Sequence, residues 1–211
     1  MAKKKEVRKR APRKTPNLEE VIAVANELLL KYGEGGFRIE DVIEKTDISK
    51  SSLYLHFGDR DGLVAAAYVE LFTMDTNRNI SQAIAAFSNI KSSEQLDSII
   101  GLLVESLVQT SADVRWNRID VLAAARHRPE FLARITEAQT RMNSALEEVF
   151  RVQQELGNAR KDMDPREMAV LIQAVSFGRL FRDIDSRMKK EDLTQWAELT
   201  TAVYKLFMTV K

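Results

Sequence analysis

Side chains able to contact a nucleic acid are concentrated in one short stretch of this 211-residue sequence. They are Lys50, Ser51, Ser52, Tyr54, Leu55 and His56. A lysine can donate to a guanine edge or a phosphate, the three hydroxyls can donate to phosphate oxygens, and a leucine can contact a thymine methyl group. The histidine donates more strongly when it is protonated. This chemistry is recognition by hydrogen bonds and apolar contacts.

The spacing around these side chains predicts a helix-turn-helix unit. Apolar residues mark one face of a short helix at 39–46, and residues 47–49 form a tight turn. Ser49 can cap a second helix at 50–57, whose width suits the major groove of DNA. An ordinary helical hairpin with a solvated polar face fits the same pattern, so the pattern alone leaves both interpretations open.

Helical spacing of apolar residues returns in every later segment, and the alternation typical of strands is absent. Asn17 and Glu20 make a capping box, Tyr32 and Gly33 end the first helix, and Asp164 caps a late one. The sequence predicts an all-α chain with helices at 17–32, 39–46, 50–57, 60–79, 81–88, 93–110, 113–127, 129–157, 165–184 and 191–208.

Charge is distributed unevenly, although the net charge is only +1. Residues 1–16 hold eight basic residues and one acid, a net +7, so the remaining 195 residues carry −6. Within residues 17–60, nine acids accompany five bases, a net −4. A basic arm on an acidic body favours a polyanion partner, most often a nucleic acid. A disordered solubilising tail is the plainer interpretation of the same arm.

Composition argues against several other classes of function. The absence of cysteine excludes a disulfide scaffold, a thiolate zinc site, a thiol nucleophile and an iron–sulfur cluster, and it fits the cytoplasm. No common nucleotide-binding, hydrolase or metalloprotease motif occurs, so we expect no enzyme, no metal and no cofactor. The apolar runs are far shorter than the roughly 20 residues that cross a bilayer, and we see no secretion signal.

The residues from Ile39 to Leu63 resemble the DNA-binding region of TetR-family transcriptional regulators. The resemblance covers about residues 17–70 and is most specific in the run Leu53-Tyr54-Leu55-His56-Phe57, which a basic residue and Leu63 follow. It implies a three-helix DNA-binding domain, joined by a fourth helix to a larger helical domain for dimerisation and ligand binding. The expected divisions are a basic arm at 1–16, a helix-turn-helix domain at 17–62 and a helical domain at 63–211.

The resemblance also implies which residues contact DNA. Those at the family's contact positions are Lys50, Ser51, Ser52, Tyr54, Leu55 and His56, and Arg60 takes the usual lysine position, where the family contacts phosphate. Arg38 stands where the family usually has a capping threonine, so the helix loses a cap but an arginine can still reach a phosphate. Asp47 replaces the usual turn glycine and tolerates a left-handed backbone. Ser51 replaces a common glycine, which bears on the operator sequence.

The last two expected helices, 165–184 and 191–208, are apolar on more than one side. Such a helix is typical of burial by its own domain and by a partner, although a central helix in a monomer shows the same pattern. Together with the resemblance, this favours a homodimer through these helices. Two recognition helices would then lie on successive major grooves of a palindromic site.

A ligand pocket is expected among the middle helices. Asp120 shares an apolar stripe with Trp116, and Gln139 shares one with Met142. Polar groups on apolar faces need a partner, which can be a small molecule but is more often a neighbouring helix. The candidate ligand residues are Trp116, Asp120, Gln139, Met142 and Phe177, of which Met142 and Phe177 are more typical of a core.

These observations favour a homodimeric transcriptional regulator that binds double-stranded DNA. We expect it to act as a repressor that a small-molecule effector releases from DNA. The alternative is an all-α interaction protein whose basic arm binds polyanions without sequence preference. Two substitutions distinguish the regulator from the interaction protein. Tyr54→Ala or Lys50→Ala should abolish motif-specific DNA binding by the regulator and should have little effect on the interaction protein.

Overall fold

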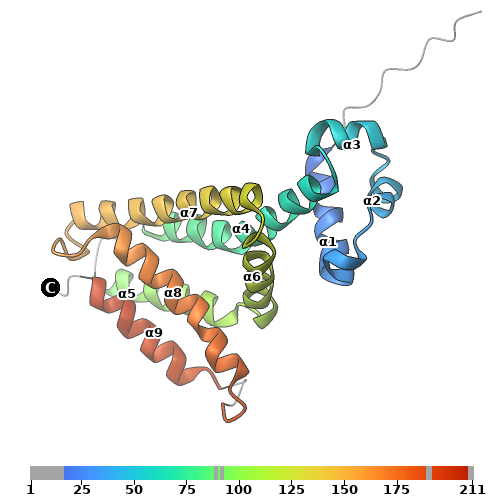
Figure 1. The fold of residues 1–211 in the computed structure, drawn as a ribbon. Helices are drawn as coiled ribbons and strands as arrows, with labels where there is room; N and C mark the ends of the chain where they lie inside the picture. Colours follow the sequence, from blue (N-terminus) through green and yellow to red (C-terminus); the bar gives the residue numbers. More distant parts are fainter. Residues whose placement is uncertain (1–16, 88–89, 91–92, 189–191, 209–211) are drawn as a thin grey trace, which may run out of the picture. The chain divides into compact units, whose positions relative to one another are not determined.

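The computed structural model describes residues 17–87, 90, 93–188 and 192–208, and over these residues the predicted all-α fold is confirmed (Figure 1). Its helices are α1 (Leu18–Gly36), α2 (Ile39–Thr46), α3 (Lys50–Phe57), α4 (Arg60–Phe87), α5 (Ser93–Gln109), α6 (Ala112–Ala125), α7 (Pro129–Glu155), α8 (Pro165–Ile184) and α9 (Thr194–Phe207). The basic arm at 1–16 lies outside the described residues.

Short-range signals in the sequence determine several helix ends. The side chains of Asn17, Ser49 and Asp164 accept hydrogen bonds from backbone amides two or three residues ahead, and they cap α1, α3 and α8 as predicted. Gly33 has φ 66° and ψ 175°, a conformation that interrupts the regular turns of α1 where the sequence predicted its end.

The prediction of two separate helices at 60–79 and 81–88 was wrong, because α4 continues from Arg60 to Phe87. The predicted boundary follows a polar stretch at 76–79, but this stretch contains neither glycine nor proline. Ile80, directly after it, is buried, so packing maintains the helix through this stretch.

The chain forms two compact units that divide between Ala67 and Tyr68, within α4. The expected division at 62–63 falls in the same helix. The first unit holds α1, α2, α3 and the start of α4. Its buried apolar side chains are Val21, Ala25, Leu28, Leu29, Phe37, Ile39, Val42, Ile48, Leu53, Leu63, Val64, Ala65 and Ala67.

The second unit holds the rest of α4 and α5 to α9. Helix α7 packs against α8, and α5 packs against α9. The buried cluster between these helices includes Ile100, Phe150, Ile172 and Phe207, and the rings of Phe150 and Phe207 meet edge to face. Among the described residues, no helix combines the length and the apolar character that a bilayer span requires.

Candidate nucleic-acid interface and ligand pocket

The turn between α2 and α3 positions the candidate DNA-binding helix. Asp47 adopts the left-handed conformation, with φ 54° and ψ 12°, and ends α2, as predicted for the residue in the glycine position. Ile48 is buried and anchors the turn in the core. The Ser49 hydroxyl accepts a hydrogen bond from the Ser52 amide at 3.1 Å, which begins α3 three residues after α2 ends.

Helix α3 has one buried side and one exposed side. Leu53 is fully buried, whereas Tyr54 is 38% exposed and Leu55 is 81% exposed. Lys50, Ser51 and His56 are exposed as well, and Ser52 is partly buried. An isolated leucine with this exposure contributes nothing to the core, so the exposed side is available for contacts with another molecule.

Lys50 is held by an acid on the preceding helix. Its ammonium donates to Glu40 Oε1 at 3.3 Å, and it lies 5.9 Å from the centre of the Tyr54 ring. A hydrogen bond from the Glu40 amide, and then the contact with Lys50, lower the pKa of the Glu40 carboxyl below its ordinary value. The carboxylate is therefore charged at neutral pH and competes with any phosphate for Lys50.

Arg60 and Arg38 differ in how far they are available for phosphate. The Arg60 guanidinium donates to the carbonyl oxygens of Glu34 and Phe37 and lies over the Phe37 ring at 5.6 Å. It thereby clamps the connection between α1 and α2. Arg38 is exposed, and its side chain makes no capping hydrogen bond to α2, as predicted.

No pattern in the sequence singles out Gly62, although the site depends on it. A Cβ atom at this position would lie 1.8 Å from the carbonyl oxygen of Phe57, the last residue of α3. Asp59 accepts from the Gly62 amide at 2.7 Å and so caps α4. The start of α4 is therefore packed directly against the end of α3, and no spacing signal encodes such a contact.

Ion pairs with acidic side chains neutralise much of the positive charge of the first unit. Lys45 pairs with Glu27, Lys50 with Glu40, and Arg60 with Glu34 and Asp61. These three are among only five bases in residues 17–60, which already carry a net charge of −4. The described part of this unit is therefore poorly equipped for non-specific attraction to DNA.

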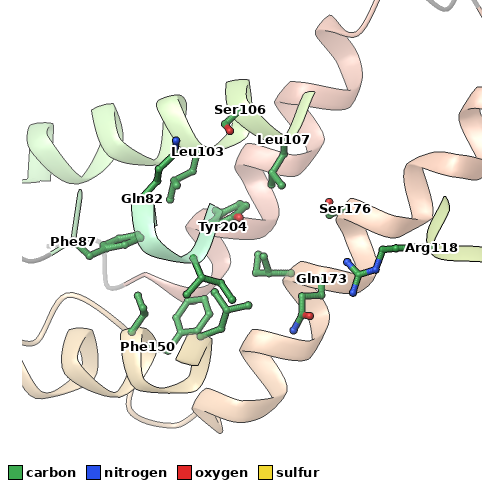
Figure 2. A pocket seen from close by; sticks show the side chains of 14 residues that line it. Gln82, Phe87, Leu103, Ser106, Leu107, Arg118, Phe150, Gln173, Ser176 and Tyr204 are labelled. Carbon is green, nitrogen blue, oxygen red and sulfur yellow. The ribbon is translucent and has the colours of Figure 1, made fainter. Parts of the chain in front are cut away.

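The second unit encloses a cavity of about 90 Å³ (Figure 2). It is lined by Ile80, Gln82, Phe87, Leu103, Ser106, Leu107, Arg118, Leu146, Val149, Phe150, Ile172, Gln173, Ser176 and Tyr204. In the same measure, one water needs roughly 10–15 Å³, so the cavity has room for a small organic molecule. Helices α4 to α9 all contribute side chains, and burial raises the pKa of Tyr204, which keeps its hydroxyl protonated.

None of the five candidate ligand residues is among these lining residues. The apolar stripe that Asp120 shares with Trp116 does not face the core, since Trp116 is 44% exposed and Asp120 is exposed. Helix α6 instead buries the face that carries Arg115, Val121 and Ala125.

The other three candidates lie closer to the core. Met142 is buried and Phe177 partly buried, as is typical of core residues. Gln139 bonds to neighbouring helices: it accepts from Arg118 Nη2 at 3.3 Å and donates to Gln173 Oε1 at 3.0 Å. The Gln139 amide therefore has hydrogen-bond partners on neighbouring helices, which is the commoner arrangement for a polar group on an apolar face.

Arg118, which was not predicted from the sequence, lines the cavity and contacts both Gln139 and the ring of Phe72. Arginines are common on helix surfaces, and the periodicity of α6 does not distinguish this one from its exposed neighbours. Among the described residues, no group of three potential metal ligands occurs.

Comparison with known proteins gives a family match for the first unit and a shared fold for most of the chain. Residues 21–67 match the model of bacterial regulatory proteins of the tetR family. No curated protein matches the chain. A solved protein from Mesorhizobium loti assigned to the TetR family of transcriptional regulators has 18% identity and a TM-score of 0.69, over 90% of this chain and 96% of its own.

Two other solved structures share the fold. A TetR transcription regulator from Haloarcula marismortui has 14% identity and a TM-score of 0.63, over 90% of this chain and 97% of its own. A protein from Saccharomonospora viridis, solved in complex with choline, has 15% identity and a TM-score of 0.61, over 92% of this chain and 97% of its own. The helix-turn-helix segment at residues 21–67 thus matches the model of bacterial regulatory proteins of the tetR family, and at least 90% of the chain shares the fold of these three solved structures.

Proposed function

We propose that the chain is a homodimeric transcriptional repressor that binds a palindromic operator through α3 and leaves it when a small molecule binds to the second unit. The observation that carries this proposal is α3 itself. Leu53 anchors one side in the core, while Lys50, Tyr54 and Leu55 project from the other, within the segment that matches the family model. Polar and apolar side chains on the exposed side of a helix are what base-edge readout requires.

Dimerisation is supported by the outer faces of the last two helices. Phe181 and Ile184 on α8 are 74% and 56% exposed, and Leu199 and Leu206 on α9 are 64% and 52% exposed. At 100° per residue, the exposed apolar residues of α8 lie opposite its buried residues, which include Ile172. Apolar patches of this kind mark interaction sites, and a second copy of the same face would cover them in an isologous dimer.

Release by an effector is supported by the cavity, and a fold neighbour solved with choline illustrates that such a fold can hold a small organic molecule. Release requires two states that differ in the separation of the two recognition helices. The effector must bind the state that cannot engage DNA more tightly, because a ligand with equal affinity for both states shifts nothing.

Selection from a random pool of duplex DNA tests the proposal. The purified chain is incubated with the pool near physiological salt, and the retained duplexes are sequenced. Enrichment of a palindrome is the expected result, because a symmetric dimer reads two related half-sites about one helical turn apart. Retention without a motif, lost as the salt concentration rises, would instead support the alternative in which the basic arm binds phosphates without sequence preference.

A further inference from the structure

The cavity of the second unit carries Arg118 at one side and phenylalanine rings at the other, where Gln82 also lies. Figure 2 shows Arg118, Gln173 and Ser176 together at one side of it, and Phe87 and Phe150 at the opposite side. Arg118 is the one charged side chain among the cavity-lining residues that the structure describes. A molecule that fits this arrangement has an apolar body and one polar end.

The guanidinium of Arg118 is held in place before any ligand arrives. It lies 4.4 Å from the centre of the Phe72 ring and donates to Gln139 Oε1. Gln139 is fixed in turn, because its amide nitrogen donates to Asn143 at 2.7 Å and to Gln173 at 3.0 Å. An oriented group loses little freedom when it binds, so this arrangement favours recognition of one ligand geometry.

The surroundings of Arg118 also determine which charge it favours. Burial lowers the pKa of Arg118, because the guanidinium lies largely out of water. A carboxylate gains charge-assisted hydrogen bonds from the planar guanidinium fork, a neutral amide gains weaker ones, and a cation is repelled.

We propose that this cavity binds a compact organic monocarboxylate, with its carboxylate on Arg118 and its apolar body against Leu107, Phe87 and Phe150. The regulatory consequence rests on the proposed function, in which such a molecule is the effector. The cavity volume of about 90 Å³ corresponds to roughly six to nine water positions, which suits an acid of about ten non-hydrogen atoms.

Three planar probes of nearly identical shape test the charge preference: benzoate, the neutral benzamide and the cationic benzamidine. The rise in melting temperature of the full chain with probe concentration gives each dissociation constant. We expect benzoate to bind with a dissociation constant on the order of 1 mM, about tenfold tighter than benzamide, and benzamidine to bind most weakly. Acetate, which has the carboxylate without the apolar body, should bind more weakly than benzoate or hexanoate.

Variants at one position assign the preference to Arg118. Arg118→Gln should reduce benzoate binding to the level of benzamide, while Arg118→Lys, which keeps the charge, should retain a smaller preference for benzoate. Arg134→Gln is the matched control, because Arg134 is exposed on α7 and its loss changes the net charge equally. Equal binding of benzoate and benzamide by the unmodified chain, no binding of any carboxylate up to about 10 mM, or an unchanged preference in Arg118→Gln would overturn the proposal.

Carboxylate binding and DNA selection are measured separately, so either one can fail while the other holds. If the chain selects a palindrome but binds no carboxylate, the ligand class is wrong and the DNA-binding proposal is unaffected. If benzoate binds through Arg118 but does not weaken the operator complex, the ligand class stands and release by this effector fails.

Discussion

Lys50 shows how one side chain of the candidate DNA interface is restrained by its neighbours. Its ammonium group is paired with Glu40, and both side chains are mostly exposed. Because the pKa of Glu40 is lowered by its own backbone amide and by Lys50, the carboxylate keeps its charge below the pH at which a glutamate normally becomes protonated. Mild acidification therefore leaves the pair intact, and a phosphate must compete with Glu40 for Lys50.

Glu40→Gln should strengthen operator binding about three- to fivefold, because it frees Lys50 and removes an acid near the phosphates. The measurement is the dissociation constant for the selected duplex at fixed salt. Glu44→Gln is the control, since Glu44 is exposed on the same helix and has the same charge. Equal gains in both variants would show that only the net charge matters and that the Lys50–Glu40 contact does not.

At the scale of the elements, features encoded over short distances were predictable and long-range contacts were not. Asn17, Ser49 and Asp164 cap helices because each interacts with amides a few residues away. Asp47 adopts a left-handed turn that its own chemistry permits. The cavity combines side chains from six helices, and neither the role of Arg118 nor the close contact of Gly62 appears in any local pattern.

The contact between α3 and α4 gives a prediction with an internal control. Gly62→Ala should destabilise the chain by about 1–3 kcal/mol and weaken operator binding, because its Cβ atom would push against the Phe57 carbonyl. Gly101→Ala adds the same methyl group in α5 with no atom within 4 Å, and it should stabilise by about 0.5–1 kcal/mol. Urea unfolding followed by circular dichroism measures both; a stability loss of similar size in the two variants would contradict the role of the close contact.

A buried charge cluster ties α6 and α8 to the end of α5. Asp183 accepts from Arg115 Nε at 2.7 Å and lies 3.6 Å from Arg179 Nε, while Arg115 also donates to the Thr110 carbonyl oxygen. Asp183→Asn should cost about 3–5 kcal/mol, because two buried arginines lose their shared carboxylate. The exposed pair of Asp97 and Lys205 is the comparison, and Asp97→Asn should cost less than about 1 kcal/mol. Similar unfolding free energies for the two variants would show that the buried charge cluster contributes no more to stability than the exposed pair.

For the whole molecule, the charge distribution suggests that the basic arm and α3 make different contributions to DNA binding. Residues 1–16 carry a net charge of +7, whereas residues 17–60 carry −4 and pair most of their bases internally. The arm would then supply much of the affinity for phosphates, and α3 most of the sequence preference.

Deletion of residues 2–14 should weaken binding to every duplex and flatten the dependence of affinity on salt, because fewer counterions are released. The ratio of operator to random-duplex affinity should change little. Titrations at several salt concentrations give both quantities, and a slope equal to that of the full chain would show that the arm does not contact the phosphates.

If the exposed side of α3 reads DNA sequence, the specificity ratio of matched tyrosine variants must depend on Tyr54. Once a palindrome has been selected, its affinity is divided by that of a scrambled duplex for the unmodified chain, Tyr54→Ala and Tyr32→Ala. Both tyrosines are exposed, but Tyr32 lies in α1 and outside α3. We predict that Tyr54→Ala lowers the ratio at least about tenfold while affinity for scrambled DNA is retained, and that Tyr32→Ala leaves the ratio unchanged. A ratio near one for the unmodified chain, or an unchanged ratio in Tyr54→Ala, would contradict the account.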